Sequence, residues 1–595
     1  MRPRLALILA TTPLLLSACG HDDDSDILAP PPTTATIATF DPSPGSPALP
    51  FPIDLLFGAD GTLNIPVSDP DDYSDPRVAL NALDGFSTVA PITTSFSAAV
   101  DASSLVAGVT VRMFEVRLSA AAGHVTQIVR ELQGNREFAV SLAPDPSRRN
   151  LVILPLAPLA PKTSYLVALS NGIRDFAGRP IGPSAAYQLS RQDSSTFVQA
   201  QETALAAFGV DRNSLVLSWS FSTQSINDVL AAVRAQARPQ AAQLRATGLD
   251  TAALGKGLPG LAAIYAGTLQ LPYYLQRNAP LSGFWKAADG TSVTRHAPQP
   301  VASETLSVPL LATLPDSDSG RRKPAGGWPV VIFQHGITRD RSDMLAIADS
   351  LAAAGFAVVA MDLPLHGITD AASPFHTPLE RTFELDLVNN VSDAPSPDGL
   401  ADPSGTHFIN LASLLTSRDN VRQGVADLFQ LTATVPTLDF DGDGSPDLDG
   451  SRIHYLGHSL GGIVGSTFLG LDTTVGAATL AMPGGGIAKL LDASPTFGPA
   501  IQAGLATKGL IKGSAAYESF LASAQAVVDA ADPVNYAVAA ADNHPLHMIE
   551  VVGGAGALPD QVIPNSVPDA PLSGTEPLAR LMRLSAVTAS VQDPA

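Results

Sequence analysis

Residues 453–462 read Ile-His-Tyr-Leu-Gly-His-Ser-Leu-Gly-Gly. An apolar run enters this stretch and a run of small and apolar residues, 463–469, leaves it, which is typical of a strand, a sharp turn and a helix. The turn has the pattern Gly-x-Ser-x-Gly, with Gly457, Ser459 and Gly461. Glycine is needed on both sides because a Cβ there would collide with the neighbouring strand or helix. The alternative is a glycine-rich loop with a chance serine; we predict that Ser459 is a nucleophile.

The chain on both sides of this turn alternates between apolar strands and helices. Strands are predicted at 329–333, 356–361, 453–456, 477–482 and 547–552, and helices at 343–354, 418–432 and from Ser459 onward. The runs 267–275 and 304–314 are expected to be antiparallel opening strands of the same sheet. This alternation predicts the α/β class: an α/β-hydrolase domain at 258–595 with a doubly wound, mostly parallel sheet. Its segment 487–540 reads as a helical insertion, which either forms a lid and acyl pocket or is simple packing.

The first half of the chain has a different pattern. Residues 37–193 carry short apolar strands separated by Pro, Gly and Asp turns, which predicts an Ig-like β-sandwich as the N-terminal domain. Residues 194–257 have helical spacing with Ala, Gln and Arg, and we interpret them as a helical connector. A length of 595 residues agrees with two to four domains.

The N-terminus resembles a bacterial lipoprotein signal. Arg2 and Arg4 precede the apolar run 5–16, which is too short to span a bilayer, and the single cysteine of the chain, Cys19, follows Leu-Ser-Ala. This predicts a signal peptide at 1–18, lipidation of Cys19 and an acidic, Pro-rich tether at 19–36. An ordinary signal peptide with a stray cysteine is the alternative. Gly20 rather than Asp after the cysteine favours the outer membrane of a Gram-negative cell envelope over the inner membrane.

The charge of the chain excludes one class of partner. The formal net charge is −21 at pH 7. A surface this acidic repels polyanions at long range, so we expect no nucleic-acid partner.

A serine nucleophile needs a base, an acid that orients the base, and oxyanion donors. The acid in α/β-hydrolases follows the serine, and Asp560 fits after the last predicted strand; a turn-capping Asp is the alternative. The expected oxyanion donors are the backbone N–H groups of Leu460 and Ile337, with Gly336 permitting the turn before Ile337. His335 is predicted to support this loop.

The base is missing from the expected position. The eleven histidines all precede Asp560, and residues 561–595 contain none. The sequence therefore stops before the histidine, or the triad is unorthodox, or the protein is inert. We favour the first interpretation and expect the reading frame to continue past Ala595 to a His flanked by Gly or Ser; His544 is the first existing histidine to test otherwise.

Residues 439–447 form an acidic loop that is similar to the first part of a calcium-binding loop. Acids stand at positions 1, 3, 5 and 9 of the loop, as Asp439, Asp441, Asp443 and Asp447. The bidentate Glu of an EF-hand is absent at position 12. The loop is either a structural calcium site or a solvated acidic turn, and no cofactor is expected to be required.

Several segments together resemble the bacterial extracellular lipase family that includes surface lysophospholipase lipoproteins, with a virulence-factor-type lipase N-terminal domain. The similar segments in the first half are 40–43, 54–57, 60–66 and 83–88. Those in the second half are 334–336, 362–367, 457–462 and 559–565. The resemblance implies hydrolysis of lipid acyl esters, as in a lipase or phospholipase. A short-chain carboxylesterase and a catalytically inert, surface-anchored binding protein are the alternatives.

Overall fold

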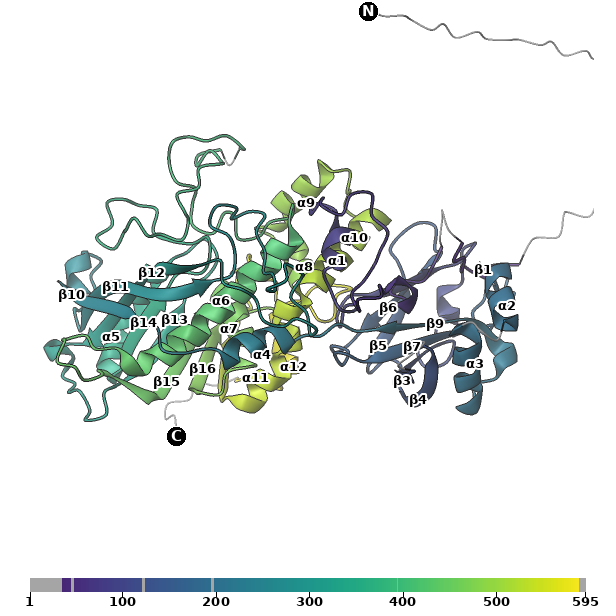
Figure 1. Cartoon of the computed structure of the whole chain (residues 1–595), viewed down its shortest axis with the longest axis horizontal. Helices are drawn as coiled ribbons and strands as arrows, with labels where there is room; N and C mark the ends of the chain where they lie inside the picture. Colours follow the sequence, from purple (N-terminus) through teal and green to yellow (C-terminus); the bar gives the residue numbers. More distant parts are fainter. Residues whose placement is uncertain (1–34, 44–47, 120–122, 194–196, 393, 588–595) are drawn as a thin grey trace, which may run out of the picture. The chain divides into compact units, whose positions relative to one another are not determined.

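We describe a computed structural model of the chain, which covers residues 35–43, 48–119, 123–193, 197–392 and 394–587 (Figure 1). The predicted signal peptide, Cys19 and nearly all of the predicted tether lie outside these residues. Residues Thr36–Ala595 group into one unit by their internal contacts. Among the described residues, no helix is long and apolar enough to cross a membrane.

The first half of the unit contains two antiparallel sheets over a shared core. One sheet has the order β2-β6-β5, and the other has the order β4-β3-β7-β9. The strands are β2 (Ile92–Ser95), β3 (Val111–Leu118), β4 (Val125–Glu131), β5 (Phe138–Leu142), β6 (Asn150–Pro155), β7 (Ser164–Ser170) and β9 (Leu215–Ser222). A parallel pair joins β1 (Ile37–Ala38) to β8 (Gly182–Pro183). Alternate residues of both sheets, such as Ile153 and Val167, are buried in one hydrophobic cluster. The Ig-like topology stays a prediction.

Residues 194–257 are not the helical connector that we predicted. The segment does contain α3 (Phe197–Ala207) and α4 (Asp228–Ala235), but β9 lies between them and pairs with β7. Strand β10 (Ala242–Asp250) already belongs to the next sheet, which therefore begins before residue 258. The reason is burial: nearly every residue of β9, including Trp219, packs into the first core, and the apolar, β-branched and aromatic residues of such a strand fit a sheet better than a helix.

The second half is built on an eight-stranded mixed sheet with the order β10-β11-β12-β14-β13-β15-β16-β17. The remaining strands are β11 (Ala262–Tyr273), β12 (Glu304–Pro315), β13 (Trp328–Gln334), β14 (Ala357–Met361), β15 (Leu448–His458), β16 (Val475–Ala481) and β17 (Leu546–Ile549). Strands β10, β11, β12 and β14 are joined by antiparallel pairing, as predicted for the opening strands, whereas β14 through β17 pair in parallel. This agrees with the predicted α/β-hydrolase architecture, in which a serine turn stands at the carboxyl end of a parallel strand.

Helices cover both faces of this sheet because successive strand residues point to opposite sides. Ile332 packs in one hydrophobic cluster and Phe333 in another. Helix α5 (Leu345–Ala354) covers the face of Phe333, whereas α6 (Leu414–Thr434) and α7 (Leu460–Leu469) cover the other, with α4 nearby (Figure 1). Two shorter helices, α11 (Ala537–Asn543) and α12 (Thr575–Leu581), also pack on the face of α7.

The segment 487–540 is helical, as its sequence indicates. It forms α8 (Ile487–Ala493), α9 (Gly498–Ala506) and α10 (Ala515–Val528), followed by short 3-10 turns and the start of α11. Two short helices in the first half, α1 (Pro76–Leu80) and α2 (Ala185–Gln192), complete the α-helices of the described chain. Helix α1 packs against α10, which brings the two halves into contact.

Candidate active site

Ser459 lies on a strained turn between β15 and α7. Its backbone has φ 53° and ψ −114°, outside the regions that an L-residue prefers. Its N–H donates to the carbonyl oxygen of Ala481 on β16, at 2.7 Å, which fixes the bend. Such strain at a non-glycine residue persists only where the surroundings impose it, and it is common at functional sites. Within the described residues, the Ser459 hydroxyl has no hydrogen-bond partner.

The two glycines that flank Ser459 allow this turn. A Cβ on Gly457 would lie 2.4 Å from the carbonyl oxygen of Gly461, and a Cβ on Gly461 would lie 2.2 Å from that of Gln334. Both distances are far below van der Waals contact. The close approach of α7 to β13 and β15 therefore requires glycine at both positions, which is the reason that the sequence predicts for the pattern.

The loop after β13 lies against the serine. A Cβ on Gly336 would be 3.1 Å from Ser459 Cβ, so the backbone of this loop passes directly beside the turn. Ile337, Ser459 and Leu460 line one common pocket. The backbone N–H groups of Leu460 and Ile337 thus belong to the two segments that meet at the serine, and their role as oxyanion donors stays a prediction.

His335 supports this loop through hydrogen bonds of its buried ring. The ring is fully buried, its Nδ1 donates to the Gly336 carbonyl oxygen at 2.8 Å, and its Nε2 accepts from the Leu363 N–H at 3.0 Å. Burial lowers the pKa of His335, and the nearby Asp362 carboxylate opposes this effect. A neutral ring with both nitrogens engaged agrees with a supporting role and not with proton transfer at Ser459.

Asp560 stands in the loop after β17 and organises its own turn. Its Oδ1 accepts from the N–H groups of Val562 and Ile563, at 2.8 and 3.0 Å. Both of these residues line the pocket at Ser459. Burial lowers the pKa of His458, and Asp560 is among the carboxylates whose charge opposes this. The carboxylate is therefore near the serine turn, but it makes the turn-capping contacts of the alternative interpretation, and its catalytic role stays a prediction.

His544 does not lie at the serine. Its Nδ1 faces the carbonyl oxygen of Val475 at 2.8 Å, and its Nε2 faces those of Leu469 and Asp472. Val475 begins β16, whereas Ser459 follows the opposite end of the adjacent parallel strand. The choice of His544 as the first histidine to test was wrong, because its ring is held at the amino-terminal end of the parallel strands, whereas Ser459 lies at their carboxyl end.

Asp362, directly after β14, is part of a buried ion cluster. Arg341 pairs with Asp362 and makes two 2.7 Å bonds to the carboxylate of Glu380. The same guanidinium donates to the Phe375 carbonyl oxygen at 2.7 Å. The cluster fastens the long irregular segment after β14 to the sheet. The sequence analysis missed Arg341 and Glu380, which show no local pattern.

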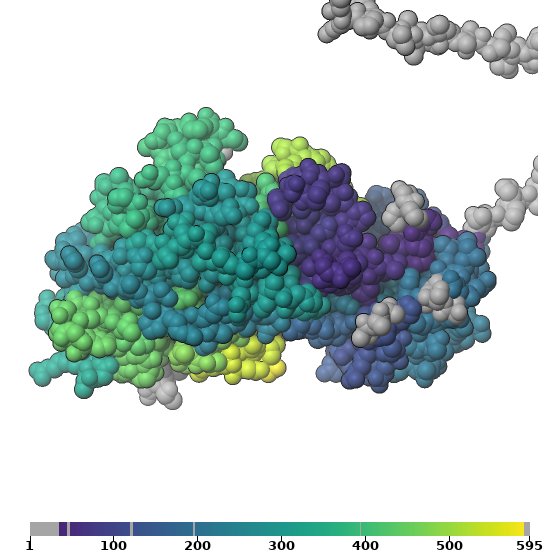
Figure 2. Space-filling model, in the orientation of Figure 1, coloured from purple at the N-terminus to yellow at the C-terminus, as the bar shows by residue number. Residues whose placement is uncertain are grey.

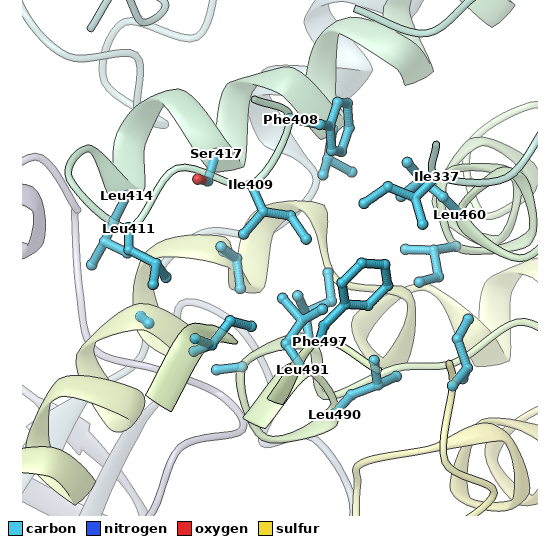
Figure 3. Close-up of a pocket in the computed structure, with 18 of the residues that line it drawn as sticks. Ile337, Phe408, Ile409, Leu411, Leu414, Ser417, Leu460, Leu490, Leu491 and Phe497 are labelled. Atoms are coloured by element: carbon cyan, nitrogen blue, oxygen red, sulfur yellow. The ribbon is translucent and has the colours of Figure 1, made fainter. Parts of the chain in front are cut away.

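Ser459 lines an apolar pocket, other lining residues of which are drawn in Figure 3. It is enclosed by α6, α7, α8, α9 and α10 and by the loops that carry Ile337 and Phe408. Leu460 and Ile337 lie at one end of the view, and Leu411 and Leu414 lie at the other. The apolar lining residues include Phe408, Ile409, Leu411, Leu414, Ile463, Leu490, Leu491, Phe497, Ile501, Phe520, Leu521, Val562 and Ile563. The only hydroxyl groups in this lining are those of Ser417 and Ser459.

The acidic loop 439–447 brings three of the four predicted calcium ligands together. Carboxylate oxygens of Asp439, Asp441 and Asp447 lie within 4.8 Å of one another, without Asp443. Both oxygens of Asp439 already accept backbone N–H groups, at 2.6 and 2.9 Å, and Asp447 pairs with Lys323. Each carboxylate oxygen keeps a further lone pair beside such a bond, and calcium binding here stays a prediction.

Comparison with known families supports the resemblance seen in the sequence. Residues 34–251 match the family described as bacterial virulence factor lipase N-terminal. This confirms the predicted resemblance to a virulence-factor-type lipase N-terminal domain over these residues. The comparison with curated proteins gives no match.

Solved structures of esterases are also similar to the chain. An acetyl xylan esterase from Paenibacillus sp. R4 has 16% identity and a TM-score of 0.29, over 55% of this chain and 88% of its own. Acetyl xylan esterase 1 from Thermoanaerobacterium sp. has 15% identity and a TM-score of 0.30, over 54% and 85%. A glucuronoyl esterase from Teredinibacter turnerae has 14% identity and a TM-score of 0.27, over 54% and 62%. These values are too low to assign a substrate to this chain.

Proposed function

We propose that this chain, whose residues 34–251 match the virulence factor lipase N-terminal family, is a serine carboxylic-ester hydrolase that acts on lipid acyl esters. The observation that carries the proposal is the position of Ser459: a strained turn places it in the lining of a pocket whose other side chains are almost entirely apolar. A pocket of this kind suits an acyl chain, because burying each methylene group contributes about 0.8 kcal/mol.

In the proposed reaction, Ser459 Oγ attacks the ester carbonyl carbon and a base takes its proton. The carbonyl oxygen becomes an oxyanion, which the N–H groups of Leu460 and Ile337 stabilise. Collapse of this intermediate breaks the bond to the alcohol, which leaves with the proton, and water then releases the acid by the same steps. Asp560 would orient the base. We assign no residue as the base, because no described histidine is hydrogen-bonded to Ser459.

Labelling with a fluorophosphonate probe tests this proposal directly. We expect the full-length protein to be labelled, because the probe reacts with activated serine hydroxyls, and we expect Ser459→Ala to lose the label. Asp560→Asn should slow labelling without removing the reactive atom. Equal labelling of the chain and of Ser459→Ala would remove Ser459 from the nucleophile role.

The dependence of kcat/KM on acyl length distinguishes the proposed function from that of a short-chain carboxylesterase. The extent of the apolar lining favours long chains, so kcat/KM should rise from p-nitrophenyl butyrate to palmitate, and lysophospholipid should be hydrolysed. A decrease along this series would favour the short-chain alternative. The absence of hydrolysis of every ester, together with the absence of labelling, would favour an inert binding protein.

Leu411→Trp should shorten the accepted acyl chain. Leu411 lines the part of the pocket away from Leu460 and is only half-buried, so the larger ring fills the far end with little disturbance of the core (Figure 3). We expect kcat/KM for p-nitrophenyl palmitate to fall about 10-fold to 200-fold, the range known for small steric changes in hydrophobic pockets. The butyrate value should stay within about twofold.

The matched control for this variant is Leu400→Trp. Leu400 belongs to the same irregular segment but is 63% exposed and does not line the pocket. Its activity on both esters should equal that of the unchanged protein. A uniform loss on both esters in Leu411→Trp would contradict the assignment of this end of the pocket to the acyl terminus.

Attachment to the outer membrane through a lipid on Cys19 remains part of the proposal, as does the absence of a nucleic-acid partner. An anchored enzyme would meet lipid esters at the surface that holds it. The predicted calcium at residues 439–447 would be structural, since no step of the proposed reaction involves it.

A further inference from the structure

A turn in the first half of the chain, at Ser87 and Thr88, forms hydrogen bonds at the C-terminal end of α10, a helix that lines the pocket. Ser87 Oγ donates to Asp529 Oδ2 at 2.6 Å, and the Thr88 N–H donates to the same oxygen at 2.8 Å. Thr88 Oγ1 also donates to Asn535 Oδ1 at 2.8 Å. Asp529 directly follows α10, so these bonds join residues more than 400 positions apart at the end of a pocket-lining helix.

From Asp529 the hydrogen bonds continue to α8, the neighbouring helix that also lines the pocket. Gln525 Nε2 donates to Asp529 Oδ1 at 3.0 Å and to Asp532 Oδ2 at 2.8 Å. Gln525 Oε1 accepts from the Ala488 N–H, and the Asp532 carboxylate accepts from the N–H groups of Gly486 and Ile487. Ile487 and Ala488 line the pocket. One buried network thus runs from the turn at Ser87, through α10, to the first turn of α8.

The apolar packing follows the same path. The hydrophobic cluster that holds the first two sheets together also includes Phe520, Leu521 and Ala524 of α10, which line the pocket. Tyr73 packs on Phe284, and the Arg295 N–H donates to Asp84 at 2.9 Å. Figure 2 shows atoms from the beginning of the described chain, coloured purple, lying directly against atoms from the middle of the chain, coloured teal. The N-terminal half of the chain therefore packs behind α10, one of the helices that line the pocket.

We propose that the turn Ser87–Thr88 positions the helices of the acyl pocket through Asp529. The N-terminal half thereby determines the affinity of the pocket for long acyl chains. Asp529 and Thr88 act here as positioning residues that do not touch the substrate. The inference rests on the proposed function in taking the pocket as an acyl site.

The environment of Asp529 indicates a positioning role rather than a general contribution to stability. Its carboxylate is fully buried, and among the described residues no Lys or Arg forms an ion pair with it. Burial raises the pKa of Asp529 to about 7. A buried carboxyl group without a cation is costly unless several donors satisfy it. Here the donors come from two segments, the turn at Ser87 and Thr88 and helix α10 at Gln525, so the group defines their relative position.

The test measures binding of the fluorescent fatty acid cis-parinaric acid, and hydrolysis of p-nitrophenyl acetate and palmitate, by the full chain. Thr88→Val removes one buried hydroxyl at constant shape, and Asp529→Asn replaces an acceptor with a donor. Both should weaken binding of cis-parinaric acid about fivefold to tenfold, as expected for one lost buried hydrogen bond. They should raise KM for palmitate by a similar factor and leave kcat for acetate within about twofold, because acetate does not reach the displaced walls.

Two further variants serve as controls. Thr88→Ser keeps the hydroxyl and should restore unchanged binding. Tyr187→Phe removes a buried hydroxyl that bonds to Ser218 at 2.8 Å within the first half, away from the pocket residues. It should lower stability to a similar degree and leave the binding of cis-parinaric acid unchanged. If Asp529→Asn fails to fold, Ser87→Ala takes its place.

Equal effects on acetate and palmitate, or weaker binding in Tyr187→Phe as well, would overturn the inference and reduce the network to general stability. Failure of the proposed function gives a different result. In that case the unchanged protein hydrolyses no ester, whereas the pattern of cis-parinaric acid binding still decides whether the turn positions the pocket.

Discussion

Gly461→Ala should reduce ester hydrolysis and fluorophosphonate labelling at least about 100-fold, because displacing a reacting group by about 1 Å can cost that much. The added methyl group would lie 2.2 Å from the Gln334 carbonyl oxygen and 2.8 Å from that of His335. Either α7 moves away from β13 or the loop at Gly336 moves. Both movements displace Ser459 relative to the predicted oxyanion donors, whose individual loss costs about 100-fold to 1000-fold in rate. Rates of p-nitrophenyl ester hydrolysis measure this effect.

The same substitution at Gly504 is the matched control. Gly504 lies in α9, where a Cβ meets no atom within 4 Å. Gly504→Ala should therefore keep full activity and add about 0.5–1 kcal/mol of stability, the helix preference of Ala over Gly. Unchanged hydrolysis in Gly461→Ala would show that the turn tolerates a side chain there and would contradict the account of its geometry.

Arg341→Met should lower the free energy of unfolding by about 3–5 kcal/mol, the cost of breaking a buried ion pair by removing one partner. The guanidinium is 2% exposed and serves both Asp362 and Glu380. Without it two buried carboxylates lose their only arginine or lysine partner among the described residues, and the segment after β14 loses its attachment. Urea unfolding followed by circular dichroism measures the change.

The loss of unfolding free energy in Arg341→Met should depend on pH in a defined direction. Burial would raise the pKa of Asp362, but the Arg341 guanidinium and His335 more than offset it, so the pKa lies below its ordinary value. This carboxylate therefore contributes stability above the ordinary Asp pKa, and the contribution is lost as the pH falls through the depressed value. In Arg341→Met the carboxylate has no such contribution, so the stability difference should be greatest at neutral pH and should narrow on acidification.

Arg339→Met is the control for this prediction. Arg339 pairs with Asp343 on the surface, where its side chain is 58% exposed. An exposed pair of this kind contributes no more than about 1 kcal/mol. Equal stability losses in Arg339→Met and Arg341→Met would contradict the importance given to burial.

Local patterns were sufficient where neighbouring residues impose the structure. The turn around Ser459 could be predicted because its glycines are required by contacts within a few residues and with the next strand. The parallel strands and the helices between them follow from apolar runs of the right length. The same holds for the helices of 487–540. Strand β9 was missed because it lies between two helical stretches, and the burial that keeps it extended comes from the opposite sheet.

Contacts distant in sequence were decided by the tertiary structure. Ser87 and Asp529 carry no pattern that would pair them, and neither do Arg341 and Glu380. His544 was only the first existing histidine to test, and the structure holds it at the other end of the sheet.

The sequence by itself determined the serine turn, the alternation of strands and helices and the family of the first half, because short-range sterics and periodicity act on adjacent residues. Only the tertiary structure decided which side chains enclose the pocket and that the N-terminal half packs behind α10. These are set by packing among helices that the chain brings together from separate segments, and such packing leaves no local signal.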